Sequence, residues 1–358
     1  MIVAFRVRRS RCRWTCAEGF SLIEMLVSIA ILGIIMAIIL SMMQQTSSLW
    51  KNTTGKLEGF RNARAAFDAM TRTISQATLQ TYFDYQDSSG NWAGTYGTSS
   101  FTSPAKYARR SDLHFICGQG TTLLGSSSTL SPVTHAIFFQ APLGYSTQYT
   151  TQQRLLNACG FYVAYGPDPN VPSYLTLAPR YRYRLMEFLQ PSESLQVYMT
   201  STLAGNPNTW FKQPITGSYS TAANSVLAEN VIALAVWPKQ TSADQANGST
   251  SLTSDYSYDS RISTGTLTYN QLPPVVEVTM VTIDETSAIH LANPNTAPNA
   301  AVGITSTLFT SATYPAAGTQ NQLQTDLATM ESTLTASHLN YRVYQTEVAI
   351  AGAKWTAQ

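Results

Sequence analysis

A long apolar run that contains one carboxylate constrains this chain more than any other feature. The run reads CAEGFSLIEMLVSIAILGIIMAIILSMM from Cys16 to Met43, and Glu24 lies near its start. As a helix, residues 20–43 would measure roughly 36 Å at about 1.5 Å per residue, which is long enough to cross a membrane. The residues SMMQQT after Leu40 lack the small-x-small pattern of a signal-peptide cleavage site, so the run is expected to be retained.

The acid in this run needs an explanation, because a carboxylate at the centre of a spanning helix costs about 2.5–3.5 kcal/mol on insertion scales. Glu24 can lie near the lipid headgroups, where it is tolerated. Alternatively, cleavage between Gly19 and Phe20 creates a new α-amino group close to Glu24. When such helices bundle, the amine of one chain can then neutralise Glu24 of a neighbour.

The positive charge of the chain is concentrated before the run. Five arginines precede Gly19, opposed only by Glu18; they are Arg6, Arg8, Arg9, Arg11 and Arg13. Beyond this leader, 17 of the 22 basic and 19 of the 20 acidic residues remain, so the rest of the chain is nearly neutral. It therefore lacks the basic surface expected for nucleic-acid binding. Positive flanks stay cytoplasmic, so the chain after the run is expected to be exported.

These features together resemble the class III signal of type IV pilins and type II secretion pseudopilins. The motif residues are Gly19, Phe20, Ser21, Leu22, Ile23 and Glu24, and Gly33 matches a glycine common in the helix of that family. The resemblance implies that a prepilin peptidase cuts after Gly19 and methylates Phe20, and that Glu24 serves assembly. It also implies a pilin-like α+β fold, with a long N-terminal transmembrane helix packed on a domain rich in antiparallel sheet.

The helix departs from the family pattern in one respect. Many pilins carry proline at the position of Ser41, whereas the first proline here is Pro104. Proline kinks a helix, so a straighter helix is expected in that region. The glycines Gly55 and Gly59 are the expected site of a bend or a break instead.

Downstream of the run, the apolar spacing first predicts a helix and then strands. Residues at helical spacing mark one apolar face that continues the rod to about Gln80: Leu57, Phe60, Phe67, Met70, Ile74 and Ala77. Strands are expected at 112–118, 135–145, 161–166, 181–188, 195–200, 230–238, 275–284 and 341–355. Polar stretches at 86–106, 120–132, 203–225, 240–270 and 291–325 are expected to be loops.

This pattern divides the chain into four predicted parts. They are a cleaved basic leader at 1–19, a transmembrane and assembly helix at 20–43, an amphipathic continuation at 44–82 and a β-rich extracytoplasmic domain at 83–358. One long helix followed by antiparallel strands is an α+β arrangement.

Two of the four cysteines are candidates for a disulfide. Cys12 and Cys16 lie in the leader, whereas Cys117 and Cys159 lie in the part expected to be exported. Because export leads to an oxidising compartment, a bridge between Cys117 and Cys159 is predicted, closing a loop of about 40 residues. The alternative is two separate buried thiols.

The sequence offers little support for an enzyme. It contains no GxSxG, Walker, HExxH or GxGxxG motif, so no catalytic residue, cofactor or metal is expected. The four histidines stand apart and are read as structural or surface residues: His114, His135, His290 and His338. A calcium site at Asp255, Asp259 and Asp284 is a weaker alternative, because their spacing does not match an EF-hand loop.

The predicted role is that of a non-enzymatic, prepilin-like subunit, minor and tip-type, in a pilus or pseudopilus. The segments LAENVIALAVWP and LPPVVEVTMVTID resemble the J-type minor pseudopilins, and other segments resemble the Verru_Chthon cassette protein C family. Expected partners are prepilin peptidase, other pilin subunits, an inner-membrane assembly platform and membrane lipid. An adhesin displayed on such a fibre is the first alternative, favoured by exposed aromatic clusters, and a secreted hydrolase is the second.

Overall fold

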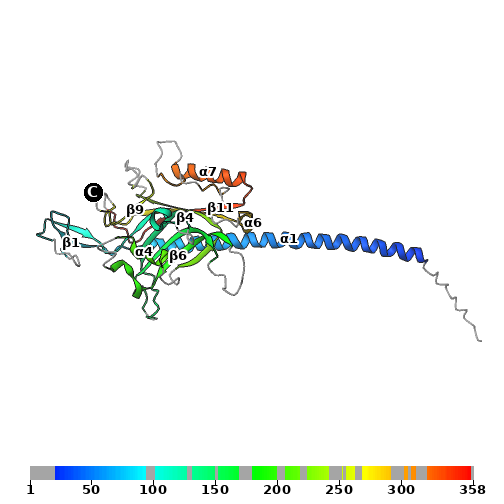
Figure 1. The fold of residues 1–358 in the computed structure, drawn as a ribbon, viewed down its shortest axis with the longest axis horizontal. Coiled ribbons are helices and arrows are strands. Elements are labelled where there is room, and N and C mark those ends of the chain that lie inside the picture. Colours follow the sequence, from blue (N-terminus) through cyan, green and yellow to red (C-terminus); the bar gives the residue numbers. More distant parts are fainter. Residues whose placement is uncertain are drawn as a thin grey trace, which may run out of the picture. The chain divides into compact units, whose positions relative to one another are not determined.

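The computed structural model describes residues 21–93, 101–126, 131–149, 152–168, 180–199, 206–217, 224–241, 252, 255–262, 268–291, 302–304, 308–311 and 321–355. The chain forms two compact units, Met1–Thr54 and Gly55–Gln358. A long helix, α1 (Leu22–Ser75), contributes to both units (Figure 1). The predicted leader and the cleavage site at Gly19 and Phe20 lie outside the described residues.

Helix α1 passes through both glycines at which a bend or break was expected. Gly55 and Gly59 keep helical backbone, so the helix does not break at either glycine. A Cβ atom at either position would meet nothing within 4 Å. The helix ends at Ser75, somewhat before the predicted Gln80, and Gln80 itself adopts a left-handed backbone with φ of 45°.

The described residues of the Gly55–Gln358 unit form three antiparallel sheets. A six-stranded sheet has the order β7-β6-β5-β4-β3-β9, a three-stranded sheet has the order β11-β10-β8, and β1 and β2 form a separate ribbon. The strands are β1 (Tyr82–Gln86), β2 (Lys106–Arg110), β3 (Ile116–Gln119), β4 (Ser131–Ala141), β5 (Asn157–Pro167), β6 (Tyr181–Gln190), β7 (Asn224–Glu229), β8 (Val231–Lys239), β9 (Tyr258–Asp259), β10 (Val275–Ile283) and β11 (Tyr341–Ala349). This architecture confirms the predicted α+β class, with a long helix followed by antiparallel sheet.

Short helices occupy stretches where loops, a strand or no regular element were expected. They are α2 (Gly120–Leu124), α4 (Thr209–Thr216), α6 (Glu285–Leu291), α7 (Gln322–Ala336) and two 3-10 turns, η1 (Ser192–Ser194) and η2 (Gln196–Tyr198). The strand predicted at 195–200 is therefore wrong. The apolar residues of α4 explain its helix, because Trp210 and Phe211 are fully buried, and Phe211 stacks on Phe138 of β4 with ring centroids 4.2 Å apart.

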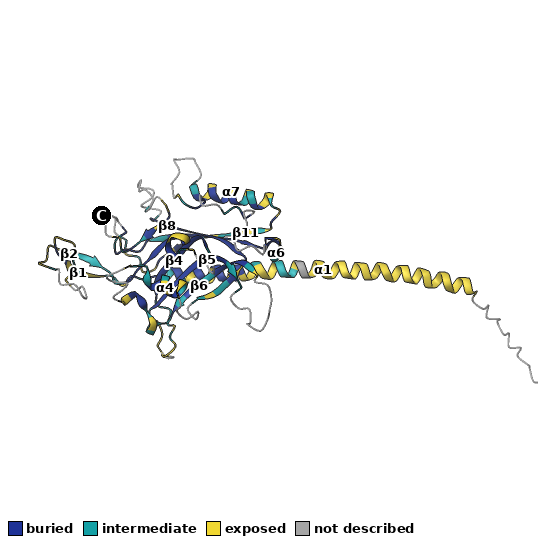
Figure 2. Cartoon of the chain, in the orientation of Figure 1, coloured by how far each residue is buried: buried dark blue, intermediate teal, exposed yellow. Residues whose placement is uncertain are grey.

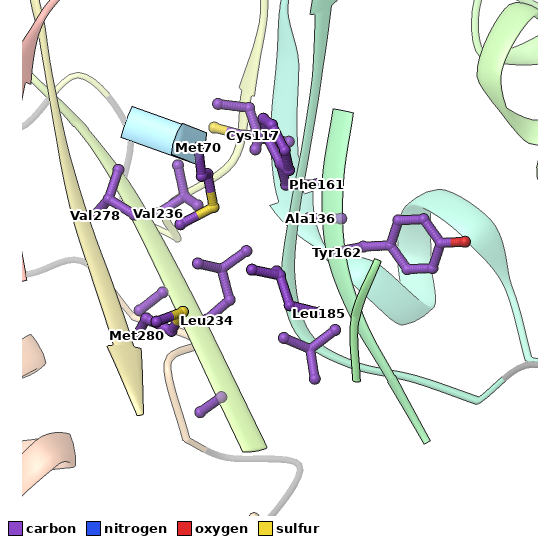
Figure 3. Close-up of a cluster of buried hydrophobic side chains, with 14 of the residues drawn as sticks. Met70, Cys117, Ala136, Phe161, Tyr162, Leu185, Leu234, Val236, Val278 and Met280 are labelled. Atoms are coloured by element: carbon purple, nitrogen blue, oxygen red, sulfur yellow. The ribbon is translucent and has the colours of Figure 1, made fainter. Parts of the chain in front are cut away.

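The core lies where the two large sheets and α1 meet. Figure 3 shows Met70 of α1 beside Val236 of β8 and Val278 of β10, with Phe161 of the six-stranded sheet on the other side, whereas Tyr162 points away. Of the predicted helix face, four residues are buried, namely Phe67, Met70, Ile74 and Ala77. Leu57 is 55% exposed, so the buried face of α1 begins after that residue.

Candidate assembly site

The first turn of α1 places Glu24 at a helix end. Ser21 precedes the helix, and its hydroxyl accepts a hydrogen bond from the backbone N–H of Glu24 at 3.3 Å. In return, the Glu24 carboxylate accepts from the backbone N–H of Ser21 at 3.4 Å. This reciprocal pair is a capping box, which satisfies two donors that a helix start leaves unpaired. The carboxylate also lies at the positive end of the helix dipole.

The apolar run that follows is exposed on every side (Figure 2). Every described residue from Ser21 to Trp50 is exposed, including Leu22, Ile29 and Ile39. By length and composition, α1 is the one described helix that could cross a membrane. A helix that is apolar all round needs an apolar environment, which lipid or neighbouring apolar helices can supply.

Within the Gly55–Gln358 unit, polar contacts join the start of this unit's part of α1 to β10, α6 and β11. The Lys56 ammonium lies 3.3 Å from the buried carboxylate of Asp284, directly after β10. The Tyr344 hydroxyl donates to the carbonyl oxygen of Phe60 at 2.9 Å, and the Arg342 guanidinium lies 4.8 Å from the Phe60 ring. Tyr344 and Arg342 of β11 thus face this helix.

Asp284 also organises the turn that begins α6. Its carboxylate accepts from the backbone N–H of Ser287 at 2.8 Å and from the Asn340 amide at 3.1 Å. Burial alone would raise the pKa of Asp284, but the donors of Ser287, Lys56 and Asn340 hold that pKa below its usual value. The sequence marked Asp284 only as a weak calcium candidate, and the structure instead places it in this hydrogen-bond network.

The other two calcium candidates are also engaged locally. Asp259 accepts from the Nε2 atom of His114 at 2.8 Å and from the backbone N–H of Arg261 at 2.8 Å. Asp255 accepts from both the hydroxyl and the backbone N–H of Ser257. Within the part of the chain that the structure describes, no group of three or more His, Cys, Asp or Glu residues could hold a metal ion.

Both buried histidines use both ring nitrogens in structural contacts. His114 receives a hydrogen bond at Nδ1 from the indole N–H of Trp210 at 3.1 Å, which leaves Nε2 to donate to Asp259. His135 receives the backbone N–H of Val236 at Nδ1 and donates from Nε2 to the carbonyl oxygen of Phe309 at 2.7 Å. Burial lowers the pKa of each ring, which keeps it neutral. These rings therefore fit the predicted structural role.

The predicted disulfide between Cys117 and Cys159 is wrong in this structure, because both residues are free and buried. Cys117 lies opposite Ile137 on one edge of β4, and Cys159 lies opposite Phe139 on the other edge. The strands that flank a third strand are separated by roughly 9.5 Å, whereas bridged cysteines have Cα atoms within about 7 Å. The alternative of two separate buried thiols describes the arrangement.

The β1–β2 ribbon carries an exposed aromatic cluster. Tyr85 lies opposite Tyr107 and Phe83 opposite Arg109, so the three aromatic rings share one face. Their exposed fractions are 57% for Phe83, 52% for Tyr85 and 63% for Tyr107, although the ring centroids lie only 5.2–5.4 Å apart. We call these three residues the aromatic ribbon face. The sequence did not single it out, because these residues flank the loop predicted at 86–106.

Residues 14–40 match a family model described as the prokaryotic N-terminal methylation motif. The chain therefore carries a prepilin-type N-terminal segment. The match covers the cleavage motif, Glu24 and most of the apolar run, and it supports the type IV pilin and pseudopilin class. Comparison with curated proteins and with solved structures finds no match.

The prepilin motif offers an explanation for the exposed apolar helix. In proteins with this segment, prepilin peptidase processes the chain and the N-terminal helix assembles with other subunits, which is a structural and not an enzymatic role. The apolar helix near the N-terminus also fits a single-pass membrane anchor. The capping box at Ser21 and Glu24 was missed at the sequence level, although the pattern S-x-x-E before an apolar run is its usual signal.

Proposed function

We propose that this chain is a minor, tip-type subunit of a pilus or pseudopilus. Prepilin peptidase cuts it between Gly19 and Phe20 and methylates Phe20. Before this cut the leader lies on the cytoplasmic side, and the processed chain remains in the inner membrane as a single-pass protein with its β-rich domain on the other side. An assembly platform adds it to other pilin subunits. The observation that carries this proposal is the prepilin motif at 14–40 on a fully exposed apolar helix.

The tip role is supported by the bulk of the Gly55–Gln358 unit. Besides its part of α1, the described residues of this unit form three sheets and four shorter helices. A subunit that repeats along a helical fibre must pack against copies on several sides, and such a large domain hinders this. At the end of a fibre the domain needs neighbours on one side only.

Glu24 has two possible contributions to assembly, and they can be separated. Its carboxylate caps α1, and its charge can pair with the α-amino group of a neighbouring Phe20. Glutamine keeps the capping box but has no charge, because S-x-x-Q caps a helix as S-x-x-E does. Glu24→Gln therefore removes only the charge, whereas Glu24→Ala removes both contributions.

The test uses the full-length chain expressed with its partner subunits. Mass spectrometry of the mature chain is expected to find methylated Phe20 at the N-terminus; an N-terminus at Met1 or beyond Met43 contradicts the processing step. Both Glu24 variants are expected to insert in the membrane, since losing an acid makes the span more apolar. Both are expected to lose co-assembly. Normal co-assembly of Glu24→Gln contradicts the charge-pairing role, and normal co-assembly of Glu24→Ala contradicts both roles.

An adhesin displayed on a fibre is a second candidate, favoured by the aromatic ribbon face. Contiguous exposed rings mark binding surfaces more often than isolated ones do. The ribbon is held in place because Arg109 donates to the Gln271 side chain at 2.9 Å and to the Lys354 carbonyl oxygen at 3.1 Å. Replacing Phe83 and Tyr107 by serine is expected to leave folding and fibre assembly unchanged and to abolish attachment of fibre-bearing cells to a surface. Unchanged attachment removes this candidate.

A further inference from the structure

An isolated apolar pair follows the membrane-spanning run on α1. After Met43, the helix continues with five polar residues, and then come Leu49 and Trp50 before the chain becomes polar again. Trp50 is 74% exposed and Leu49 is 66% exposed. Within the Met1–Thr54 unit, this pair lies outside the continuous apolar run that the membrane core would accommodate. The prepilin motif ends at residue 40 and gives the pair no role.

The axial spacing of this pair from the start of the helix matches the thickness of a membrane. Trp50 lies 28 residues after Leu22 in one continuous helix, which is about 42 Å at 1.5 Å per residue. A bilayer with its headgroup layers is roughly 40–45 Å thick, and its hydrocarbon core is roughly 30 Å thick. Met25 to Met43, the apolar part after Glu24, covers about 27 Å at the same rise. The hydrocarbon core is therefore filled by that segment, and both ends fall in headgroup layers.

We infer that Trp50, supported by Leu49, anchors the inserted chain in the headgroup layer on the side opposite the leader, while Glu24 lies in the headgroup layer on the leader side. The indole ring has an apolar body and one N–H donor, so it favours the boundary between lipid chains and headgroups. The five polar residues between Met43 and Leu49 cross the carbonyl region. The partner is thus the phospholipid headgroup layer.

The anchor fixes the depth of Glu24. Sliding the helix by one turn toward the exported side would pull Glu24 into hydrocarbon and push Trp50 into water. Sliding it the other way would bury the glutamines Gln44 and Gln45 in hydrocarbon. Both displacements are unfavourable, since polar groups in hydrocarbon lack hydrogen-bond partners. Glu24 then stays solvated until assembly, without a buried charge in the membrane-inserted state. This inference rests on the proposed function only in requiring α1 to enter a membrane.

The experiment measures the depth of the Trp50 ring in the full-length chain. One chain per lipid nanodisc is prepared with phosphatidylcholine brominated either near the glycerol end or near the methyl end of its acyl chains. Bromine quenches tryptophan fluorescence at short range. The chain has six tryptophans, so the signal of Trp50 is taken as the difference between wild type and Trp50→Phe. We expect at least twofold stronger quenching of this signal by the shallow bromines than by the deep ones.

A matched variant moves the ring along the same helix. Trp50→Thr combined with Thr46→Trp places the indole four residues, or about 6 Å, closer to the membrane centre. In this variant the deep bromines are expected to quench more strongly than they quench Trp50. For the wild type, absence of quenching by either lipid places Trp50 in water, and stronger quenching by the deep bromines places it in hydrocarbon. Either result overturns the anchor.

Failure of the anchor and failure of the proposed function are distinguishable. Flotation of the same chain with lipid vesicles reports whether α1 inserts at all. A chain that does not float contradicts both the membrane-inserted precursor and the anchor. A chain that floats and co-assembles, but whose Trp50 signal is not quenched by shallow bromines, contradicts the anchor alone.

Discussion

The Nδ1 atom of His135 accepts a hydrogen bond from the backbone N–H of Val236 at 2.9 Å. His135 belongs to the six-stranded sheet and Val236 to the last strand of the three-stranded sheet, so the bond joins the two sheets. Thr134 makes the equivalent contact, because its hydroxyl accepts the backbone N–H of Leu234 at 3.0 Å. Side chains of β4 thus satisfy two backbone donors on the outer edge of β8 that another strand would otherwise pair.

An irregularity in β4 makes these contacts possible. The pairing of β4 with β5 shifts register between Val133 and Ala136, and Thr134 adopts a left-handed backbone with φ of 56°. A bulge of this kind bends a strand and redirects its side chains. Here the redirected side chains are Thr134 and His135, and they point to β8.

Replacing His135 by phenylalanine is expected to destabilise the protein. The substitution keeps a buried ring but leaves the Val236 N–H without its acceptor, whereas the Phe309 carbonyl oxygen still accepts from the Gln119 amide at 2.6 Å. One unpaired buried donor costs about 1–3 kcal/mol, so the free energy of unfolding should fall by about that amount. Urea denaturation of the detergent-solubilised full chain measures this. His290→Gln is the control, since His290 is exposed on α6, and equal stability of the two variants would contradict the assigned role of His135.

The two buried histidines also predict how stability changes with pH. Burial lowers the pKa of His114 and of His135 in the folded chain, so the unfolded chain binds more protons below its ordinary histidine pKa of about 6.5. Their contribution to stability is therefore complete above that pH and is lost as the pH falls below it. The carboxyls of Asp259 and Asp284, whose pKa values are lowered, lose their contribution only below about pH 4.

Unfolding measured between pH 8 and pH 5 separates the histidine contribution from that of Asp259 and Asp284. Stability is expected to be flat from pH 8 to about 7 and then to fall toward pH 5. His135→Phe should flatten part of that fall while lowering stability at all pH values. A wild-type curve without any loss down to pH 5 would contradict the assignment of both rings as neutral and buried.

Much of the fold could be predicted from local sequence patterns. The predictions that were wrong share one cause, which is that they depended on contacts between distant parts of the chain. The strands at 181–188, 230–238 and 275–284 were predicted within a few residues, because each segment is rich in aromatic, aliphatic or β-branched side chains. The strand predicted at 195–200 is a 3-10 turn instead, since Val197 is buried by a tertiary contact and not by pairing. Short apolar runs do not distinguish these two outcomes.

The missed helices depend on distant partners. Helix α7 buries Leu323, Leu327, Met330 and Leu334, but threonine, serine and glutamine separate these residues and masked the pattern. The disulfide prediction failed for a related reason. Compartment and burial favoured a bridge between Cys117 and Cys159, whereas strand order decides their separation, and strand order is a long-range property. By contrast, the prepilin motif is contiguous, so the sequence alone located the candidate assembly site.

Adding a side chain at Gly160 of β5 is expected to destabilise the protein. A Cβ atom at this position would lie 2.1 Å from the Cδ1 atom of Phe138 and 2.7 Å from the carbonyl oxygen of Ile137. The Phe138 ring cannot retreat easily, because it stacks on Phe211 at 4.2 Å. Gly160→Ala should therefore lower the free energy of unfolding by about 1–3 kcal/mol, as overpacking of a core does.

Gly59→Ala serves as the control for this substitution. Gly59 lies in α1, where an added Cβ meets nothing within 4 Å, and alanine is favoured over glycine in a helix by about 0.5–1 kcal/mol. The same urea denaturation should show a gain or no change for Gly59→Ala. If Gly160→Ala proves as stable as Gly59→Ala, the Phe138 ring must be able to move away from the added Cβ atom. That result would contradict the tight packing assigned to Gly160.

The state of the two cysteines gives the last prediction. Both Cys117 and Cys159 are buried thiols, and burial raises the pKa of each, so the reactive thiolate is scarce. The folded, exported protein should resist alkylation, and both residues should be alkylated once the chain is denatured without reductant. Cys159→Ala should lower the free energy of unfolding by about 1 kcal/mol, the cost of losing one buried group, equally with and without reductant. A bridge would instead make the loss about 2–5 kcal/mol and confine it to oxidising buffer. Peptide mapping that finds Cys117 joined to Cys159 would contradict the position of β4 between them.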